Sequence, residues 1–247
     1  MTKTDHRTPP PHPADPRARR SQLLWPVTAV VLYVVALLLG FWAKEAGPGS
    51  PELGWDIALS HARSGWFSAA SLWINTVLQP LGGVVILGAV CLVLWSRRGL
   101  ATAVAYGSTV CAAWLPAAGG KSLVDRARPP MGATHALVAE LGTDSFPSGH
   151  TELAAALVLA MVLVVARTNR ARLVVGILGT GATAVVALSR LYLGVHYPSD
   201  VMGSVLVASA GALLWTWLWR ARIGLWWEAR AGARRALHGT RVGGRGA

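Results

Sequence analysis

The chain is 247 residues long, and 53% of these residues are hydrophobic whereas only 14% are charged. This composition excludes an ordinary soluble domain and favours a membrane protein. The net charge of +12 would also fit a nucleic-acid-binding protein, but the positions of the basic residues indicate another cause. The two cysteines, Cys91 and Cys111, both lie in apolar runs, so their spacing predicts no disulfide framework and no metal site.

The N-terminal segment, residues 1–22, is rich in proline and basic side chains, and we predict a disordered cytoplasmic tail because it has little apolar surface to bury. The apolar run at 23–43 is long enough for a membrane span, which needs about 20 helical residues. It is also longer than the apolar part of a signal peptide, about 7–15 residues, so we expect it to be retained. A polar loop with several glycines and prolines is predicted for residues 44–63.

After this loop, apolar residues recur at three- and four-residue spacing from Trp66 to Leu78, with serines and Asn75 on the other face. This periodicity predicts an amphipathic helix lying in the membrane interface. Pro80 is expected to kink or break the span that follows. The predicted fold class is therefore all-α, a bundle of six transmembrane helices with one additional interfacial helix. The six predicted spans are 23–43, 77–95, 100–120, 151–166, 173–188 and 201–218.

The basic residues of the chain alternate with these spans. Of the 23 Lys and Arg residues, 17 lie in the N-terminal tail, the turn at 96–99, the segment 167–172 and the arginine-rich tail at 220–247, which together hold 3 of the 11 acidic residues. Cytoplasmic segments of membrane proteins carry such an excess of positive charge. We therefore predict a multi-pass protein of the plasma membrane with both termini in the cytoplasm. The charge of +12 is then a topology signal, and nucleic acid is not expected as a partner.

Three polar stretches depart from this apolar pattern: residues 121–129, 147–150 and 189–200. In the six-span topology all three lie on the extracytoplasmic side. Ionisable groups at the ends of membrane spans are costly to place and are therefore candidates for function. The one domain predicted to carry the site spans residues 23–219.

The first and third stretches supply cations. Lys121 and Arg128 are seven residues apart and would share one face of a helix, and Arg190 ends the fifth span. Three converging cations are suited to a phosphate group, which arginine binds in a bidentate manner. Ser148 and Gly149 precede the next helix, whose N-terminal N–H groups also favour an anion.

The two histidines of these stretches indicate acid–base or nucleophilic chemistry. His196 and Asp200 are four residues apart, and Pro198 is expected to begin the last span between them. The carboxylate would fix the tautomer of the His196 ring and leave its other nitrogen as a nucleophile. His150 then fits the acid that protonates the leaving group.

Each feature taken alone has an ordinary structural explanation, such as a lysine at the end of a span or a turn before a helix. Arg126, Asp125 and Glu152 are assigned no functional role. We expect Asp125 to pair with Lys121 at four-residue spacing, and Glu152 to lie in the first turn of a helix. Together, however, the three stretches on one side of the membrane predict a single phosphate site.

In order and spacing, the three stretches resemble the signature of the type 2 phosphatidic acid phosphatase superfamily, which includes membrane lipid phosphatases and vanadium haloperoxidases. The matching patterns are K-x6-R-P, P-S-G-H and S-R-x5-H-x3-D, carried by Lys121, Arg128, Pro129, Pro147, Ser148, Gly149, His150, Ser189, Arg190, His196 and Asp200. The resemblance covers residues 121–200 and not the first two spans or the tails.

This resemblance implies a metal-independent enzyme without a cofactor, in which His196 forms a phosphohistidine and Asp200 orients it. His150 would protonate the leaving group and then activate water. It also implies a lipid phosphate as substrate: polyprenyl diphosphate of the undecaprenyl type, phosphatidylglycerophosphate or phosphatidic acid. Two alternatives remain at this point, a vanadate-dependent haloperoxidase and a non-catalytic transporter or binding protein for lipid phosphates. The oligomeric state is not indicated.

Overall fold

The computed structural model describes residues 16–47, 49–140, 142 and 144–243, and this part of the chain is helical, as predicted. Its backbone pairing outside helices is confined, in the described residues, to one isolated bridge between Ala127 and Asp144. The elements are α1 (Pro16–Glu45), α2 (Pro51–His61), α3 (Gly65–Val77), α4 (Pro80–Arg98), α5 (Leu100–Trp114), α6 (Pro116–Val124), α7 (Met131–Thr134), α8 (Gly149–Ala160), the π-helical η1 (Met161–Val165), α9 (Asn169–Tyr192) and α10 (Pro198–Gly243).

Five helices in the described residues are long and apolar enough to cross a membrane: Leu24–Glu45, Pro80–Arg98, Leu100–Val124, Asn169–Tyr192 and Pro198–Arg222. The remaining predicted span corresponds to a shorter apolar helix, Gly149–Val165. This segment is packed inside the bundle against α5, α9 and α10. The outer helices, by contrast, expose many large apolar side chains, which is the surface that a bilayer would cover.

Several differences between the predicted and observed helices occur where a proline begins a helix. The polar loop predicted for 44–63 is wrong over Pro51–His61, which forms α2, because proline at the first helical position is well suited to start a helix. Pro80 begins α4 in the same way and separates it from α3, and Pro116 divides the predicted third span into α5 and α6.

The N-terminal tail also differs from the prediction. Helix α1 begins at Pro16, within the segment expected to be disordered, whereas residues 1–15 lie outside the described part of the chain. Helix α10 continues to Gly243, well beyond the predicted end of the last span at residue 218.

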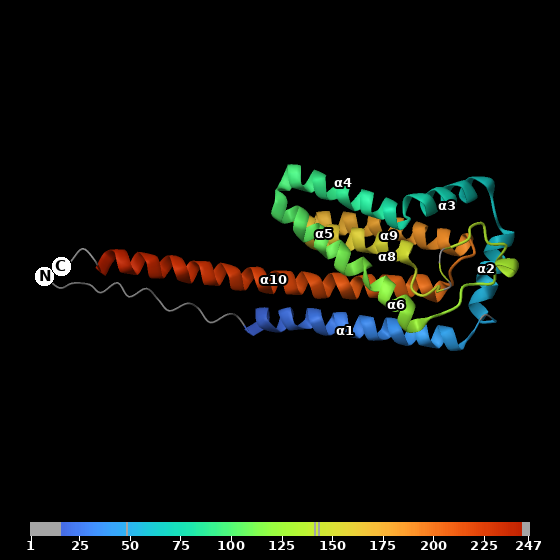
Figure 1. The fold of residues 1–247 in the computed structure, drawn as a ribbon, viewed down its shortest axis with the longest axis horizontal. Helices are drawn as coiled ribbons and strands as arrows, with labels where there is room; N and C mark the ends of the chain where they lie inside the picture. Colours follow the sequence, from blue (N-terminus) through green and yellow to red (C-terminus); the bar gives the residue numbers. More distant parts are fainter. Residues whose placement is uncertain (1–15, 48, 141, 143, 244–247) are drawn as a thin grey trace.

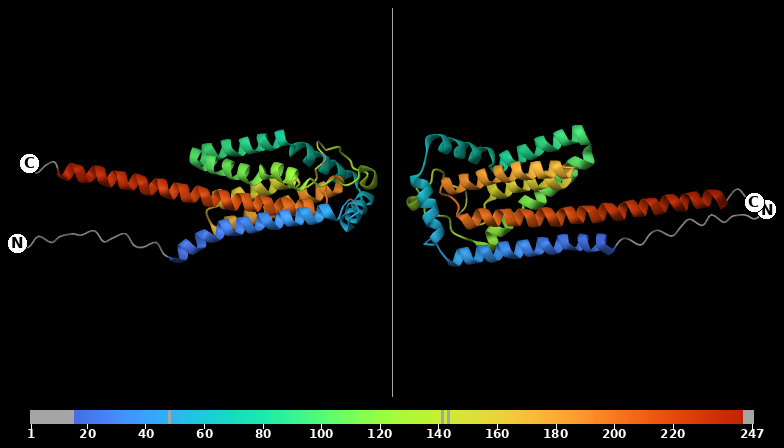
Figure 2. Two further views of the ribbon diagram at one scale, coloured as in Figure 1. Left: turned by 60° about the horizontal axis from the view of Figure 1, so that its bottom comes forward. Right: turned by 180° about the vertical axis from the view of Figure 1, so that it is seen from behind.

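Two ends of the bundle are clearly distinguished in Figure 1, where α1 and α10 run side by side in opposite directions. The α4–α5 turn and the η1–α9 connection lie at the end where α1 begins. The opposite end holds α2, α7 and the connections α6–α8 and α9–α10, and Figure 2 shows this arrangement from two further directions. All three polar stretches identified in the sequence are thus at one end.

Small residues allow some of these helices to approach closely. A side chain at Gly211 of α10 would clash with the backbone of α5 at Ala112, and one at Gly179 of α9 would clash with Val158 of α8. Gly179 therefore permits close packing of α9, whereas Gly176 and Gly181 of the same helix face open space.

Candidate active site

The three polar stretches meet around a cavity of about 240 Å³ at the end of the bundle that carries α2 and α7. The cavity is bordered by α3, the start of α4, α5, α6, α8 and the segments that connect α3 to α4, α6 to α7, α7 to α8 and α9 to α10. Its lining residues are Asn75, Leu78, Gln79, Pro80, Trp114, Lys121, Arg128, Ala139, Glu140, Gly149, His150 and His196. Two histidines and two cations therefore share one small space.

His196 and Asp200 form the contact expected from their spacing. His196 lies in the turn before α10 and Asp200 in the first turn of that helix, which Pro198 begins. His196 Nδ1 is 3.3 Å from Asp200 Oδ2, and the same oxygen accepts the Tyr197 N–H at 2.9 Å. The buried carboxylate can only accept, so it selects the tautomer in which Nδ1 carries the proton.

The other ring nitrogen of His196 lies toward the cations of the cavity. Arg128 Nη1 is 3.3 Å from His196 Nε2 and also donates to the Val195 carbonyl at 2.9 Å. Burial lowers the pKa of His196 well below its usual value, and the charges of Arg128, Arg190 and Lys121 act in the same direction. The imidazole is therefore neutral at physiological pH, with a lone pair at Nε2.

Lys121 and Arg128 both line the cavity, but the prediction that they share one face of a helix is wrong. Helix α6 ends at Val124, followed by Asp125 in the left-handed region with φ of 50°, so the two cations do not share a helix face. Lys121 Nζ donates to the Asp144 carbonyl at 2.7 Å instead of pairing with Asp125. Asp125 lies 3.7 Å from Lys44 in a partly exposed ion pair.

The Pro147–His150 stretch is anchored by the residue before it. The ring of Phe146 is fully buried between α1 and α10, against Gly40 and Gly203, where any side chain would collide with it. From this anchor the chain enters α8, with Ser148 at the N-cap position and Gly149 as the first helical residue. The helix N-terminus thus lies at the cavity wall.

The two polar residues of this stretch differ in position. His150 lines the cavity, and its Nε2 lies 3.2 Å from the Asn75 carbonyl, which as an acceptor requires a proton on that nitrogen. Ser148 is fully buried and lies outside the cavity lining. Its N–H donates to Ser204 at 2.8 Å, and its hydroxyl accepts from Thr151 at 3.3 Å.

Arg190 is fully buried at the end of α9 and does not line the cavity directly. Its guanidinium donates to Asn75 Oδ1 at 2.7 Å and forms an ion pair with Glu140, which does line the cavity. The Glu140 carboxylate therefore lies between the Arg190 guanidinium and the cavity in which a phosphate would bind.

Asn75 and Glu140 were not identified from the sequence as site residues. Asn75 was recognised only as part of the polar face of a predicted interfacial helix, but its main-chain carbonyl contacts His150 and its side-chain oxygen accepts from Arg190. Glu140 lies in a connection without periodicity. The available signal was its position between two of the signature stretches.

Arg126 was assigned no role, yet its side chain is only 3% exposed and connects Asp200 to Glu52. Arg126 Nη1 donates to Asp200 Oδ1 at 2.7 Å and Nη2 donates to Glu52 Oε2 at 2.7 Å. Glu152 is in the first turn of α8, as predicted, and is fully buried.

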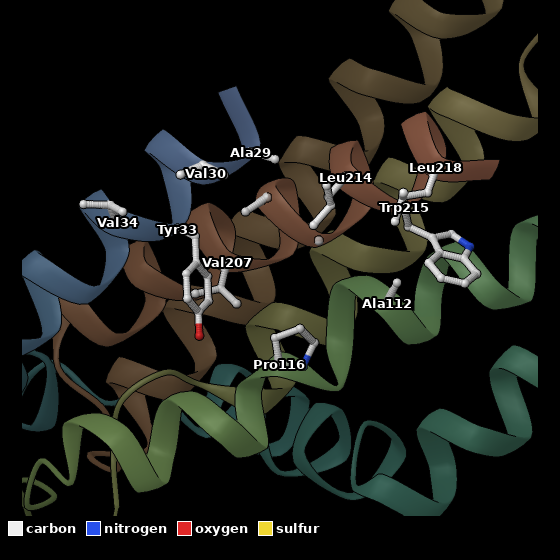
Figure 3. Close-up of a pocket in the computed structure, with 12 residues that line it drawn as sticks. Ala29, Val30, Tyr33, Val34, Ala112, Pro116, Val207, Leu214, Trp215 and Leu218 are labelled. Atoms are coloured by element: carbon white, nitrogen blue, oxygen red, sulfur yellow. The ribbon is translucent and has the colours of Figure 1, made fainter. Parts of the chain in front are cut away.

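A second cavity, of about 360 Å³, lies between α1, α5, α6 and α10. Figure 3 shows Tyr33 of α1, Pro116 of α6 and Trp215 of α10 around it, with aliphatic side chains between them. Its lining contains no ionisable group other than the Tyr33 phenol, so it has no charge with which to hold a phosphate. The cavity with the two histidines is therefore the candidate active site.

Comparisons with known proteins agree with this fold. A family model described as the PAP2 superfamily matches residues 98–224, which is just over half of the chain. Among solved structures, the chain is similar to the first transmembrane PAP2 type phosphatidylglycerolphosphate phosphatase from Bacillus subtilis, with a TM-score of 0.57 and 22% identity. That similarity covers 76% of this chain and 94% of the other. A search of curated protein sequences gives no match.

Proposed function

The chain belongs to the PAP2 superfamily, and from this premise we propose that it is a membrane-bound phosphatase acting on a lipid phosphomonoester or diphosphate. The observation that carries the proposal is the arrangement of the neutral His196 ring. Asp200 holds the ring at Nδ1, and Nε2 faces a cavity that Lys121 and Arg128 also line. A nucleophile and cations in one small cavity are the requirements for phosphoryl transfer.

In the proposed first step, His196 Nε2 attacks phosphorus and the bond from phosphorus to the lipid oxygen, or to the bridging diphosphate oxygen, breaks. His150, starting as the imidazolium with both ring nitrogens protonated, donates a proton to that leaving oxygen and becomes neutral. The product is a phosphohistidine. Its ring keeps the proton on Nδ1, which is hydrogen-bonded to Asp200. In the second step His150 accepts a proton from water, the water oxygen attacks phosphorus, and the bond to Nε2 breaks to release phosphate.

The phosphate oxygens require compensation of the charge that develops during both steps. Lys121, Arg128 and the Gly149 amide at the start of α8 are positioned to supply it directly. Arg190 contributes once phosphate replaces Glu140 as its partner. Ser148, buried behind the cavity wall, acts in this scheme by holding the turn through Ser204.

The charge pattern supports six spans, with the shorter segment Gly149–Val165 as the sixth and both termini cytoplasmic. The cavity would then lie at the outer surface of the plasma membrane, where a lipid can present its head group from the bilayer. Polyprenyl diphosphate, phosphatidylglycerophosphate and phosphatidic acid all carry the required group.

The decisive experiment measures phosphate release from these three lipids by purified protein, comparing wild type with His196→Ala. The matched control is His61→Ala, because His61 is exposed at the same end of the molecule. We expect turnover of at least one lipid by wild type and His61→Ala and none by His196→Ala. Undiminished release by His196→Ala would refute the mechanism, and binding of all three lipids without turnover by wild type would favour the binding protein.

A further inference from the structure

A buried network of charges connects α2 to the proposed nucleophile, and Arg126 is at its centre. The Arg126 guanidinium donates to Glu52 at 2.7 Å, to Asp200 at 2.7 Å and to the Ser199 hydroxyl at 2.6 Å. The ring of Tyr197 lies 3.9 Å from the guanidinium carbon. An arginine held by this many partners has one orientation, which fixes in turn the groups it contacts.

Glu52 holds the other side of this arginine and the start of α10. Its Oε1 accepts the Ser199 N–H at 2.8 Å, and its Oε2 accepts the Ser199 hydroxyl at 2.8 Å. A carboxylate at a helix N-terminus is favoured by the free N–H groups and the helix dipole. Glu52 belongs to α2, outside the residues 98–224 that match the family model.

The two oxygens of Asp200 are divided between this network and His196. Oδ1 accepts from Arg126, whereas Oδ2 faces His196 Nδ1 and accepts the Tyr197 N–H. Without Arg126, a rotation of the carboxylate would move Oδ2 away from the imidazole. The orientation of His196 therefore depends on a contact that Asp200 makes on its opposite side.

The charges of the network also matter. Glu52, Arg126 and Asp200 together carry one net negative charge beside a ring that becomes cationic when Nε2 is phosphorylated. Asp56 of α2 does not add to this charge at neutral pH, because burial, together with the charges of Asp200 and Glu52, raises its pKa to about 8. Removal of the Glu52 charge would leave Asp200 neutralised by Arg126.

We infer that Glu52 and Arg126 are positioning residues that hold Asp200, and through it His196, in the geometry and charge state needed for phosphoryl transfer. This inference rests on the proposed phosphatase function. It adds an α2 residue to the machinery of a site whose other members come from α3 onward.

The test uses the full-length protein in detergent with whichever lipid phosphate the wild type hydrolyses. Glu52→Gln keeps the size of the side chain and can still accept a hydrogen bond from Ser199. Arg126→Lys keeps the positive charge but loses the planar guanidinium that donates to several partners at once. We expect each to lower kcat about 10- to 100-fold and to leave KM within about 2-fold, because the phosphate contacts remain. Lys44→Gln, which breaks the partly exposed ion pair with Asp125, is the matched control and should retain wild-type kcat.

A second arm separates positioning from a structural tie between helices. In an Asp200→Asn background, Glu52→Gln should cause no further loss of kcat, because its effect passes through Asp200. Full kcat in Glu52→Gln, an effect confined to KM, or losses that multiply with Asp200→Asn would each overturn the inference while the phosphatase itself stands. Absence of turnover in the wild type would overturn the proposed function, and with it this inference. If Arg126→Lys fails to fold, Glu52→Gln alone decides.

Discussion

Arg128 Nη1 lies 3.3 Å from His196 Nε2, the ring nitrogen that faces away from Asp200. An arginine is a permanent donor, so its N–H occupies the lone pair that the proposed mechanism requires for attack. Binding of a phosphate at Arg128 would offer the guanidinium a stronger, charged acceptor and release Nε2. In the proposed mechanism, the same residue would thus contact the nucleophile before the substrate binds and then hold the phosphate.

Arg128→Gln tests both roles. We expect kcat/KM for phosphate release to fall about 100- to 1000-fold, because a donor to the transition-state charge is removed. Since Arg128 is one of the charges that lower the pKa of His196, its removal should also raise that pKa. A raised pKa means that the neutral nucleophile is lost at higher pH, so the acid limb of the kcat/KM profile should move upward. Arg98→Gln, an exposed arginine at the other end of the bundle, should change neither quantity.

Glu140→Gln tests whether a carboxylate competes with phosphate for Arg190. Burial raises the pKa of Glu140, but nearby positive charge, above all that of Arg190 and also that of Arg128, outweighs this effect and the net pKa is lowered, so Glu140 is ionised at neutral pH. A neutral amide would release Arg190 more readily, and inorganic phosphate should inhibit the variant several-fold more strongly. Inhibition constants for wild type, Glu140→Gln and the exposed control Glu45→Gln provide the measurement. An unchanged or weaker inhibition would show that Glu140 does not compete.

Asp56→Asn should alter the pH dependence of stability. The pKa of Asp56 is raised from 3.8 to about 8 by burial and by the charges of Asp200 and Glu52. Between these values the folded protein keeps a proton that the unfolded chain releases, so stability falls as pH rises from about 4 to about 8, by at most about 1.4 kcal/mol per pH unit.

The asparagine variant lacks this titration. In detergent, the transition temperature of the variant should therefore increase relative to that of the wild type as the pH is raised from 5 to 8. Above pH 8 the difference between the two transition temperatures should become constant. A constant difference across this range would mean that Asp56 does not hold its proton in the folded protein.

Phe146→Ala should destabilise the protein and disturb the site together. Phe146 is fully buried between Gly40 and Gly203, so its removal leaves a cavity and a cost of about 3–5 kcal/mol. Because it anchors the chain that leads into α8, His150 should lose its fixed position and kcat should fall. Phe41→Ala is the matched control, since Phe41 is 45% exposed on the same helix as Gly40. A normal transition temperature in Phe146→Ala would contradict the proposed anchoring.

The local patterns of the sequence were informative about the elements and the chemistry. Long apolar runs indicated the helices that can cross a membrane, since the required length follows from the thickness of the bilayer. The four-residue spacing of His196 and Asp200 predicted their contact, because Pro198 begins a helix there and a side chain in the first turn of a helix can reach back to the residues that precede it. The interval between Lys121 and Arg128 predicted a shared helix face and failed, because the helix ends between them.

What the sequence by itself determined, then, was the helical membrane class and the set of residues proposed to carry phosphate chemistry, since both depend on composition and short-range spacing. Only the tertiary structure decided which groups support them. Glu52 contacts Arg126 across 74 positions and Ser199 across 147, and Asn75 contacts Arg190 across 115. A buried charge is stabilised by whichever partner the packing of the helices brings to it, and that packing is a property of the whole chain rather than of any segment.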